Sequence, residues 1–302
     1  MLQKELRKLI LIFVVPPILA WAILNIYPMI SAFYWAMTDY DGITTSSQVF
    51  TGLENYRLLM NDTRWWDSMG NTFIIAVGLI VTILPISLLF AVLITNTVKG
   101  QGFFKTFVYL PSILPIVITA LLWVFILDPT VGLLGGAVDG LGVRDNLKEF
   151  LGVTNLNFIG NPNLARWTVV FVSAWAAVGG YTIYFMAGLS RIPTELYDAA
   201  KIDGAQGWPM FWQITFPLLY PVVQTITMLL IINSLQNFAF IYVLSGGTPG
   251  SATQVMSTYI YRTAFNDHRF GYATALGTIM MVVVLVFTIT SRQLSKREVI
   301  QY

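Results

Sequence analysis

The densest group of polar side chains inside an apolar stretch of the sequence comprises Asn233, Ser234, Gln236 and Asn237. Residues three and four positions apart share a face of a helix, so Asn233, Gln236 and Asn237 are predicted to form one amide face. An amide left unsatisfied in hydrocarbon costs on the order of several kcal/mol. We therefore expect this face to meet protein or water rather than lipid.

Two interpretations of the amide face stay open. Amides both donate and accept hydrogen bonds, so the face could line a pathway for a polar solute. The alternative is that these amides fasten helices together, which is common in membrane bundles. Tyr181 and Tyr184 lie in another apolar stretch. They could offer aromatic surfaces to a solute, or serve only in packing and at the membrane interface.

The residue types that catalysis and metal binding need are scarce. The 302 residues include no cysteine and one histidine, His268, which excludes thiolate catalysis, cysteine metal sites and histidine-cluster zinc sites. No paired carboxylates or serine constellation converge on a common site, so we predict no enzyme, no catalytic residue and no metal. A phosphate-binding loop needs a Gly-Lys dipeptide, which the chain lacks. We expect no cofactor in this chain.

Composition places the protein in a lipid bilayer. Hydrophobic residues make up 56% of the chain, charged residues only 11%, and the mean hydropathy is +0.69. Soluble domains carry about 25% charged residues. The net charge of +2 gives no reason to expect nucleic acid as a partner.

Six apolar runs are long enough to cross about 30 Å of hydrocarbon as helices. We predict an all-α, polytopic membrane protein forming a single domain over residues 1–302, with spans near 9–33, 71–95, 106–127, 166–189, 218–244 and 271–290. One set of connections carries ten basic against five acidic residues and the other seven against ten. The positive-inside rule then predicts that both termini are cytoplasmic.

Several local features qualify these spans. Ala20-Trp21-Ala22 resembles a signal-peptide cleavage site, but the apolar run continues past Tyr27, so we favour an uncleaved helix. Prolines predict bends in the first and third spans. The bends are expected at Pro16, Pro17, Pro28, Pro111 and Pro115. The long outer connections are 39–70, 128–165 and 245–270, and a short amphipathic helix is predicted over Leu53–Met60.

The connection at residues 191–217 carries the most specific pattern. Pro193 suits a first helical turn, Gly204 suits the left-handed residue that ends a helix, and Pro209 suits the start of a second helix. Ala199 and Ala200 offer a small-residue face onto which another protein could close. From the residues alone, an interfacial helix lying under its own bundle is an equally good interpretation.

This spacing resembles the EAA motif of binding-protein-dependent ABC importer permeases. The motif is Glu-Ala-Ala, three residues, Gly, nine residues, Ile, one residue, Leu and Pro. Its positions here are Asp198, Ala199, Ala200, Gly204, Ile214, Phe216 and Pro217. Asp198 replaces Glu and Phe216 replaces Leu. Other stretches resemble the sugar-permease branch of maltose, glycerol-phosphate and lactose-type uptake: Gly52–Tyr56, Phe103–Lys105 and Phe240–Gly247.

The resemblance implies a type I ABC importer permease fold and a role as half of a translocation pathway for a sugar or sugar-like solute, working by alternating access. The ATPase-coupling residues would be Glu195, Asp198, Ala199, Ala200, Gly204, Ile214 and Pro217. The pathway residues would be Asn233, Ser234, Gln236, Asn237, Tyr181 and Tyr184.

The implied partners are a second homologous permease in a heterodimer, two copies of a cytoplasmic ATPase that bind ATP and Mg²⁺, and an extracytoplasmic solute-binding protein. The implied location is the inner, or plasma, membrane of a prokaryote. Two alternatives remain: an importer permease for a non-sugar solute, and a secondary transporter working without ATP. The second is disfavoured, because proton-coupled carriers place charged residues inside the membrane, whereas the interiors of these spans contain none and only Arg166 lies at an edge.

Overall fold

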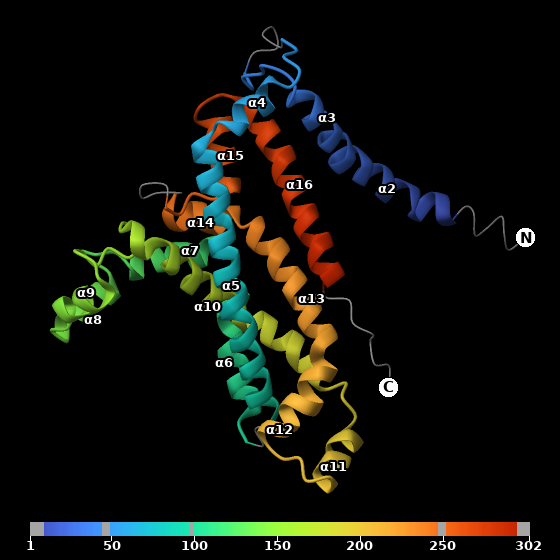
Figure 1. Ribbon diagram of the computed structural model, residues 1–302, viewed down its shortest axis with the longest axis vertical. Helices are drawn as coiled ribbons and strands as arrows, with labels where there is room; N and C mark the ends of the chain where they lie inside the picture. The colour runs from blue at the N-terminus through green and yellow to red at the C-terminus, as the bar shows by residue number, and fades with distance from the viewer. Residues whose placement is uncertain (1–8, 44–48, 97–98, 247–251, 295–302) are drawn as a thin grey trace, which may run out of the picture. The chain divides into compact units, whose positions relative to one another are not determined.

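The computed structural model describes residues 9–43, 49–96, 99–246 and 252–294, and these residues form helices joined by turns (Figure 1). The predicted orientation depends partly on residues outside the described ones, namely Lys4, Glu5, Arg7, Lys8, Lys296, Arg297 and Glu298. The helices are α2 (Val15–Trp21), η1 (Ala22–Ile26), α3 (Tyr27–Trp35), α4 (Glu54–Met60), α5 (Thr63–Asn96), α6 (Gln101–Ile113), α7 (Ile116–Ile126), α8 (Leu133–Gly140), α9 (Arg144–Leu151), α10 (Pro162–Leu189), α11 (Thr194–Ile202), α12 (Trp208–Met210), η2 (Phe211–Thr215), α13 (Phe216–Leu235), α14 (Phe238–Ser245), α15 (Met256–Phe265) and α16 (Phe270–Leu294).

The chain divides into two compact units. Unit 1 holds residues 1–63 and 260–283, and unit 2 holds residues 64–259 and 284–302. In unit 1 the Asn55 side chain donates to the carbonyl oxygens of Ala36 and Thr38, both at 2.9 Å. The Tyr272 hydroxyl donates to Asp62 Oδ2 at 2.6 Å. These bonds connect segments that are distant in the sequence, including the α4 helix predicted over Leu53–Met60.

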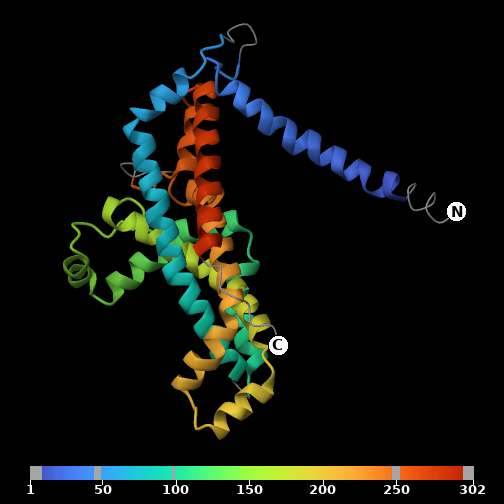
Figure 2. The same ribbon diagram turned by 45° about the vertical axis from the view of Figure 1, so that its right-hand side comes forward.

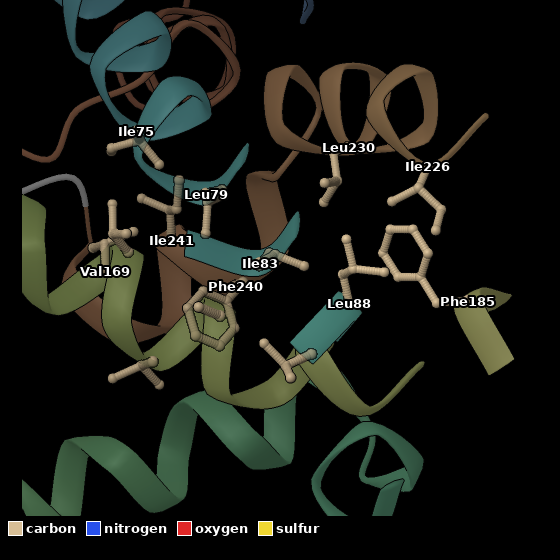
Figure 3. Close-up of a cluster of buried hydrophobic side chains, with 14 of the residues drawn as sticks. Ile75, Leu79, Ile83, Leu88, Val169, Phe185, Ile226, Leu230, Phe240 and Ile241 are labelled. Atoms are coloured by element: carbon tan, nitrogen blue, oxygen red, sulfur yellow. The ribbon is translucent and has the colours of Figure 1, made fainter. Parts of the chain in front are cut away.

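Unit 2 is built around one apolar core, which α5, α7, α10, α13 and α14 share (Figure 3). Its largest fully buried side chains include Phe185, Phe240, Ile75, Ile83 and Ile226. Burial of each such side chain contributes about 1.5–3 kcal/mol where it leaves water, whereas in a bilayer close packing takes over that role. This core holds the helices that surround the cavity described below.

Five helices in the described residues are long and apolar enough to cross a membrane: Leu9–Trp35, Thr63–Asn96, Pro162–Leu189, Trp208–Leu235 and Phe270–Ser291. A sixth candidate is the pair α6 and α7, which bends by 93° between Ile113 and Ile116. The third predicted span, 106–127, is therefore a broken helix. Pro115 lies in extended conformation at the break. Its ring removes a backbone donor and disfavours helical conformation at the residue before it, Leu114.

The fifth predicted span, 218–244, differs more from the structure. Its helix begins at Trp208, inside the predicted connection, and α13 ends at Leu235. Gln236 and Asn237 leave helical geometry, with ψ of 11° and 66°, before α14 begins. No proline marks this second break, and the apolar pattern continues through it, so the sequence predicts no interruption here. The prediction that Asn233, Gln236 and Asn237 share one helical face is consequently wrong.

Two π-helical segments occur where proline follows. η1 precedes Pro28, and η2 precedes Pro217. Proline cannot donate to the carbonyl four residues earlier and clashes with it, and a widened turn relieves that clash. The chain therefore stays helical through both prolines.

The predicted outer connection 128–165 contains two short helices, α8 and α9, which have a small apolar core of their own around Val138, Val153 and Leu156. Both helices project from the side of unit 2 (Figures 1 and 2). Arg144 forms two hydrogen bonds with Asp139, the one from Nη2 to Oδ2 measuring 2.7 Å. This guanidinium lowers the pKa of the Asp139 carboxyl.

Candidate functional site

A cavity of about 460 Å³ lies in unit 2, among α5, α6, α7, α10, α13 and α14. Five of the six residues predicted to line a pathway surround it: Tyr181, Asn233, Ser234, Gln236 and Asn237. Tyr184 lies beside Tyr181, with ring centroids 6.3 Å apart, but it is exposed and is not part of the cavity lining. The structure thus gathers side chains from two apolar stretches around one space.

A hydrogen bond joins the two sets of predicted pathway residues. Asn233 Nδ2 donates to the Tyr181 hydroxyl oxygen at 3.2 Å, linking α13 to α10. The bond leaves the amide oxygen of Asn233 and the hydroxyl hydrogen of Tyr181 able to bind something else. Both chemical interpretations of the amides therefore have a counterpart in the structure, since Asn233 fastens two helices and also borders the cavity.

Both helix breaks open onto this cavity. Leu114 and Ile116 line it from the first break, and Gln236, Asn237 and Phe238 line it from the second. A helix end leaves backbone N–H or C=O groups without partners inside the helix. The breaks therefore bring backbone donors and acceptors, as well as side chains, to the cavity wall.

Sequence reasoning missed three hydroxyl residues in the lining, Ser112, Thr119 and Ser173. The Ser112 oxygen accepts a hydrogen bond from the Gly180 N–H at 2.9 Å. This contact depends on the close approach of α6 to α10, where a Cβ on Gly179 would lie 2.8 Å from that same oxygen. The feature that marks Ser112 is its position opposite the glycine pair Gly179 and Gly180 of another helix. The sequence of a single helix does not show which residues of a second helix lie opposite it.

The predicted coupling connection forms a helix, a tight turn and a second helix, as the sequence indicated. α11 covers the predicted first helix with Glu195 in its first turn, Gly204 follows at φ +84°, and Pro209 lies in the first turn of α12. α11 and α12 lie together at one end of unit 2 in both views (Figures 1 and 2). The second helix is not separate, because it continues through η2 into α13.

The residues predicted for coupling divide into exposed and buried sets. Asp198 and Ala199 are exposed, and Asp198 accepts a hydrogen bond from Lys201 Nζ at 2.9 Å. Ala200 is 6% exposed and packs against its own chain, so only Ala199 of the alanine pair faces outward. Ile214 is half-buried and Pro217 is exposed. The small-residue face expected from both alanines is therefore narrower than predicted.

A groove of about 640 Å³ separates α11 from the ends of α5 and α10. In the groove lining, the Tyr197 hydroxyl and Thr215 Oγ1 are 3.3 Å apart and form the hydrogen bond that ties α11 to η2. Along α12, η2 and the start of α13, Trp208, Phe211, Trp212 and Phe216 contact one another through their rings. The connection is thus anchored to the start of α13 by one polar contact and an aromatic cluster.

Comparison with known proteins supplies a family. Residues 83–299 match the family described as binding-protein-dependent transport system inner membrane component. A probable starch degradation products transport system permease protein of Thermoanaerobacterium thermosulfurigenes is 32% identical over 298 residues, covering 95% of this chain and 94% of that protein. A diacetylchitobiose uptake system permease protein of Streptomyces coelicolor is 31% identical, covering 92% of this chain and 79% of that protein.

Two solved structures share the fold. One is a chain of a bacterial ABC transporter involved in the import of the acidic polysaccharide alginate, with a TM-score of 0.80 and 26% identity, covering 98% of this chain and 99% of that one. The other is from a bacterial alginate ABC transporter in complex with an alginate pentasaccharide-bound periplasmic protein, with a TM-score of 0.79 and 25% identity, covering 99% of this chain and 98% of that one.

Proposed function

The chain belongs to the family of binding-protein-dependent transport system inner membrane components, and on that premise we propose that it forms half of the pathway of an ATP-driven sugar importer. The relatives named for starch degradation products and diacetylchitobiose support a sugar or sugar-like solute. The observation that carries the proposal is the cavity at two helix breaks, lined by four polar residues of the α13–α14 region and by Tyr181.

The pathway would work by alternating access. In one state the cavity opens toward the outside and in the other toward the cytoplasm, and ATP binding by a partner changes which state is favoured. The hydroxyls of a sugar can replace water at Asn233, Asn237 and Tyr181 with hydrogen bonds of similar strength. Weak, replaceable contacts of this kind let a solute enter and leave.

The connection around α11 is proposed to receive the driving force. The residues assigned to contact with an ATPase are Glu195, Asp198, Ala199, Ala200, Gly204, Ile214 and Pro217. Asp198 and Ala199 are exposed for that contact, whereas Ala200 is buried and packs α11 against the rest of the chain. Because α12 and η2 continue into α13, displacement of this connection would be transmitted to the helix that carries Asn233.

The proposed assembly has four further parts: a second homologous permease, two copies of a cytoplasmic ATPase that bind ATP and Mg²⁺, and an extracytoplasmic solute-binding protein. The alginate transporter solved with a periplasmic protein supports the last of these. The assembly would lie in a prokaryotic inner membrane with both termini of this chain and α11 on the cytoplasmic side.

Uptake by the assembled importer in proteoliposomes tests the pathway. The Asn233→Leu variant keeps the side-chain size but loses the amide, and we expect uptake of radiolabelled maltotriose at limiting concentration to fall about tenfold, equivalent to about 1.4 kcal/mol of solute binding. The matched control is Thr227→Val on the same helix, because the Thr227 hydroxyl bonds to Val223 and is outside the cavity lining. Equal uptake by both variants would contradict the pathway assignment.

A further inference from the structure

Ser173 differs from the threonines on the cavity helices. The hydroxyls of Thr182, Thr227 and Thr168 each donate to the carbonyl four residues earlier, at 2.8–3.0 Å. Ser173 is only 8% exposed, yet its oxygen has no hydrogen-bond partner within the part of the chain that the structure describes. It also borders the cavity. The Ser173 oxygen is fully buried, so it can meet a solute only after rotation about χ1. A hydrogen bond formed then would recover the cost of an unpartnered buried hydroxyl, which is about 1–3 kcal/mol.

Ser173 belongs to a stripe that runs along α10. Ser173, Ala177 and Tyr181 are four residues apart and all line the cavity. At about 1.5 Å per residue the stripe is about 12 Å long. The small side chain of Ala177 leaves room between two polar ends, and the far end is the hydroxyl that accepts from Asn233. The stripe therefore offers two separated hydrogen-bonding groups to an elongated solute.

Every side chain in the described lining is uncharged at neutral pH. The polar members are Ser112, Thr119, Ser173, Tyr181, Asn233, Ser234, Gln236 and Asn237, and the others are apolar. A carboxylate or phosphate that enters such a wall loses hydration without gaining a cationic partner, which costs far more than the loss of a neutral hydroxyl's hydration. Solute hydroxyls lose less and find donors and acceptors in return.

The helix breaks reinforce this neutrality. α6 ends and α7 begins at one break, and α13 ends and α14 begins at the other. The C-terminal end of a helix carries partial negative charge and the N-terminal end partial positive charge, so each break places opposite partial charges side by side. The electric fields of the two helix ends cancel each other at a distance, whereas the individual N–H and C=O groups remain available to bind. Neither break favours a solute with net charge.

We propose that this half of the pathway selects uncharged, hydroxyl-rich solutes against carboxylated or phosphorylated ones, with Ser173 as a hydrogen-bonding contact once its side chain rotates toward the cavity. This selection rests on the proposed function, because it assumes that solute passes through the cavity. It distinguishes this chain from the structural relative whose solute is an acidic polysaccharide.

The natural absence of cysteine from the chain allows a direct test. An Ala177→Cys variant, assembled with cysteine-free partner subunits in proteoliposomes, places a single thiol in the cavity wall. Its rate of reaction with neutral N-ethylmaleimide is measured with increasing maltotriose, or with the same trisaccharide ending in glucuronic acid. We expect maltotriose to slow labelling, and the carboxylated sugar to need a concentration at least ~10-fold higher for the same protection. A Thr130→Cys variant, in an exposed turn, is the control that neither sugar protects.

The contribution of Ser173 is measured in the same background. Ser173→Ala is expected to raise the protecting concentration of maltotriose about fivefold, as loss of one neutral hydrogen bond predicts. Thr182→Ala, whose hydroxyl bonds within α10, should leave it unchanged, and Ser173→Thr, which keeps a hydroxyl, should restore protection.

The outcomes separate the two proposals. Equal protection by the neutral and the carboxylated sugar would overturn selection by charge and leave the pathway assignment standing. Protection by neither sugar would overturn the proposed function together with this inference. An unchanged protecting concentration in Ser173→Ala would remove Ser173 from the solute contacts.

Discussion

The cavity of unit 2 and the α11 connection are both polar regions of a largely apolar chain, but their polar groups are arranged in opposite ways. In the cavity, neutral polar groups from α6, α7, α10, α13 and the break after α13 face a shared space, and the Ser173 hydroxyl has no partner in the described structure. In the connection, the charged pair Asp198–Lys201 is satisfied locally, three residues apart and exposed. The cavity therefore has polar groups that are available to bind a small molecule. The polar groups of the connection are already paired and form a surface that a protein could contact.

The comparison also separates what depends on tertiary packing from what depends on local sequence. Cavity residues are brought together by contacts such as that between Asn233 and Tyr181, 52 positions apart. The connection is defined by a helix, a left-handed glycine and a proline within 24 residues of chain, from 194 to 217. Changes to the connection should therefore disturb coupling without disturbing the bundle, and changes to the packing around the cavity should do the reverse.

The largest expected effect is the removal of residues 198–204, the end of α11 and its turn. We expect ATP-dependent uptake to be lost, because the surface proposed to meet the ATPase disappears. Insertion and the thermal melting of the purified bundle should change little, because these residues are outside the core of unit 2. Uptake and melting are measured on the same preparation. Normal uptake by this variant would contradict the coupling role of the α11 connection.

The next effect concerns packing behind the cavity. Gly179→Ala would place a Cβ against the α6 backbone and 2.8 Å from Ser112 Oγ, and overpacking of this kind costs about 1–3 kcal/mol. Gly180→Ala is the matched control, because its Cβ would meet Ser112 at 3.9 Å. We expect a lower melting temperature in detergent for Gly179→Ala only. Equal melting temperatures of the two variants would contradict the close approach of α6 to Gly179.

A smaller effect is expected at the link between the two regions. Tyr197→Phe removes the hydroxyl that bonds to Thr215, and the loss of a neutral hydrogen bond costs about 0.5–1.5 kcal/mol. Solute-stimulated ATP hydrolysis should become less tightly linked to uptake, while maltotriose protection at the cavity stays unchanged. Thr215→Val should have the same effect, and the double variant should add little to either single change. Additive effects would argue against this bond as the link.

The smallest expected effect is on the exposed ion pair. Lys201→Ala removes the partner of Asp198, and an exposed pair on a helix contributes about 0.3–0.5 kcal/mol. We expect the melting temperature to shift by less than the error of the measurement. A loss of uptake in this variant without a change in melting would show that the pair serves the protein partner, which would sharpen the contrast with the cavity.

The sequence predicted the connection better than the cavity for a physical reason. Gly204 and Pro209 act through their own backbone dihedrals, so their effect is visible in a few residues. The break at Gln236 and Asn237 has no such mark, and the apolar pattern there predicts a continuous helix. Ser173 could not be distinguished from any other serine in a membrane helix, because its significance lies in the missing partner.

The predictions about individual pathway residues had mixed outcomes for the same reason. Residue type indicated that the amides near Asn233 would meet protein or water, since hydrocarbon penalises them, and Asn233 does bond to Tyr181. The orientation of Tyr184 depended on the packing angle of α10, which periodicity alone does not supply. The inward-facing Ala200 was likewise hidden, because the pattern of the motif does not say which alanine faces the chain itself.

The π-helical segment η2 sets the angular phase between the connection and α13. A π-turn holds one residue more than an α-turn, and each residue of an α-helix advances the chain by about 100° around the axis. The extra residue therefore rotates everything before Phe211 by about a quarter turn relative to Asn233. The one extra residue in this turn, close to Pro217, therefore determines the direction in which the connection that carries Asp198 leaves α13.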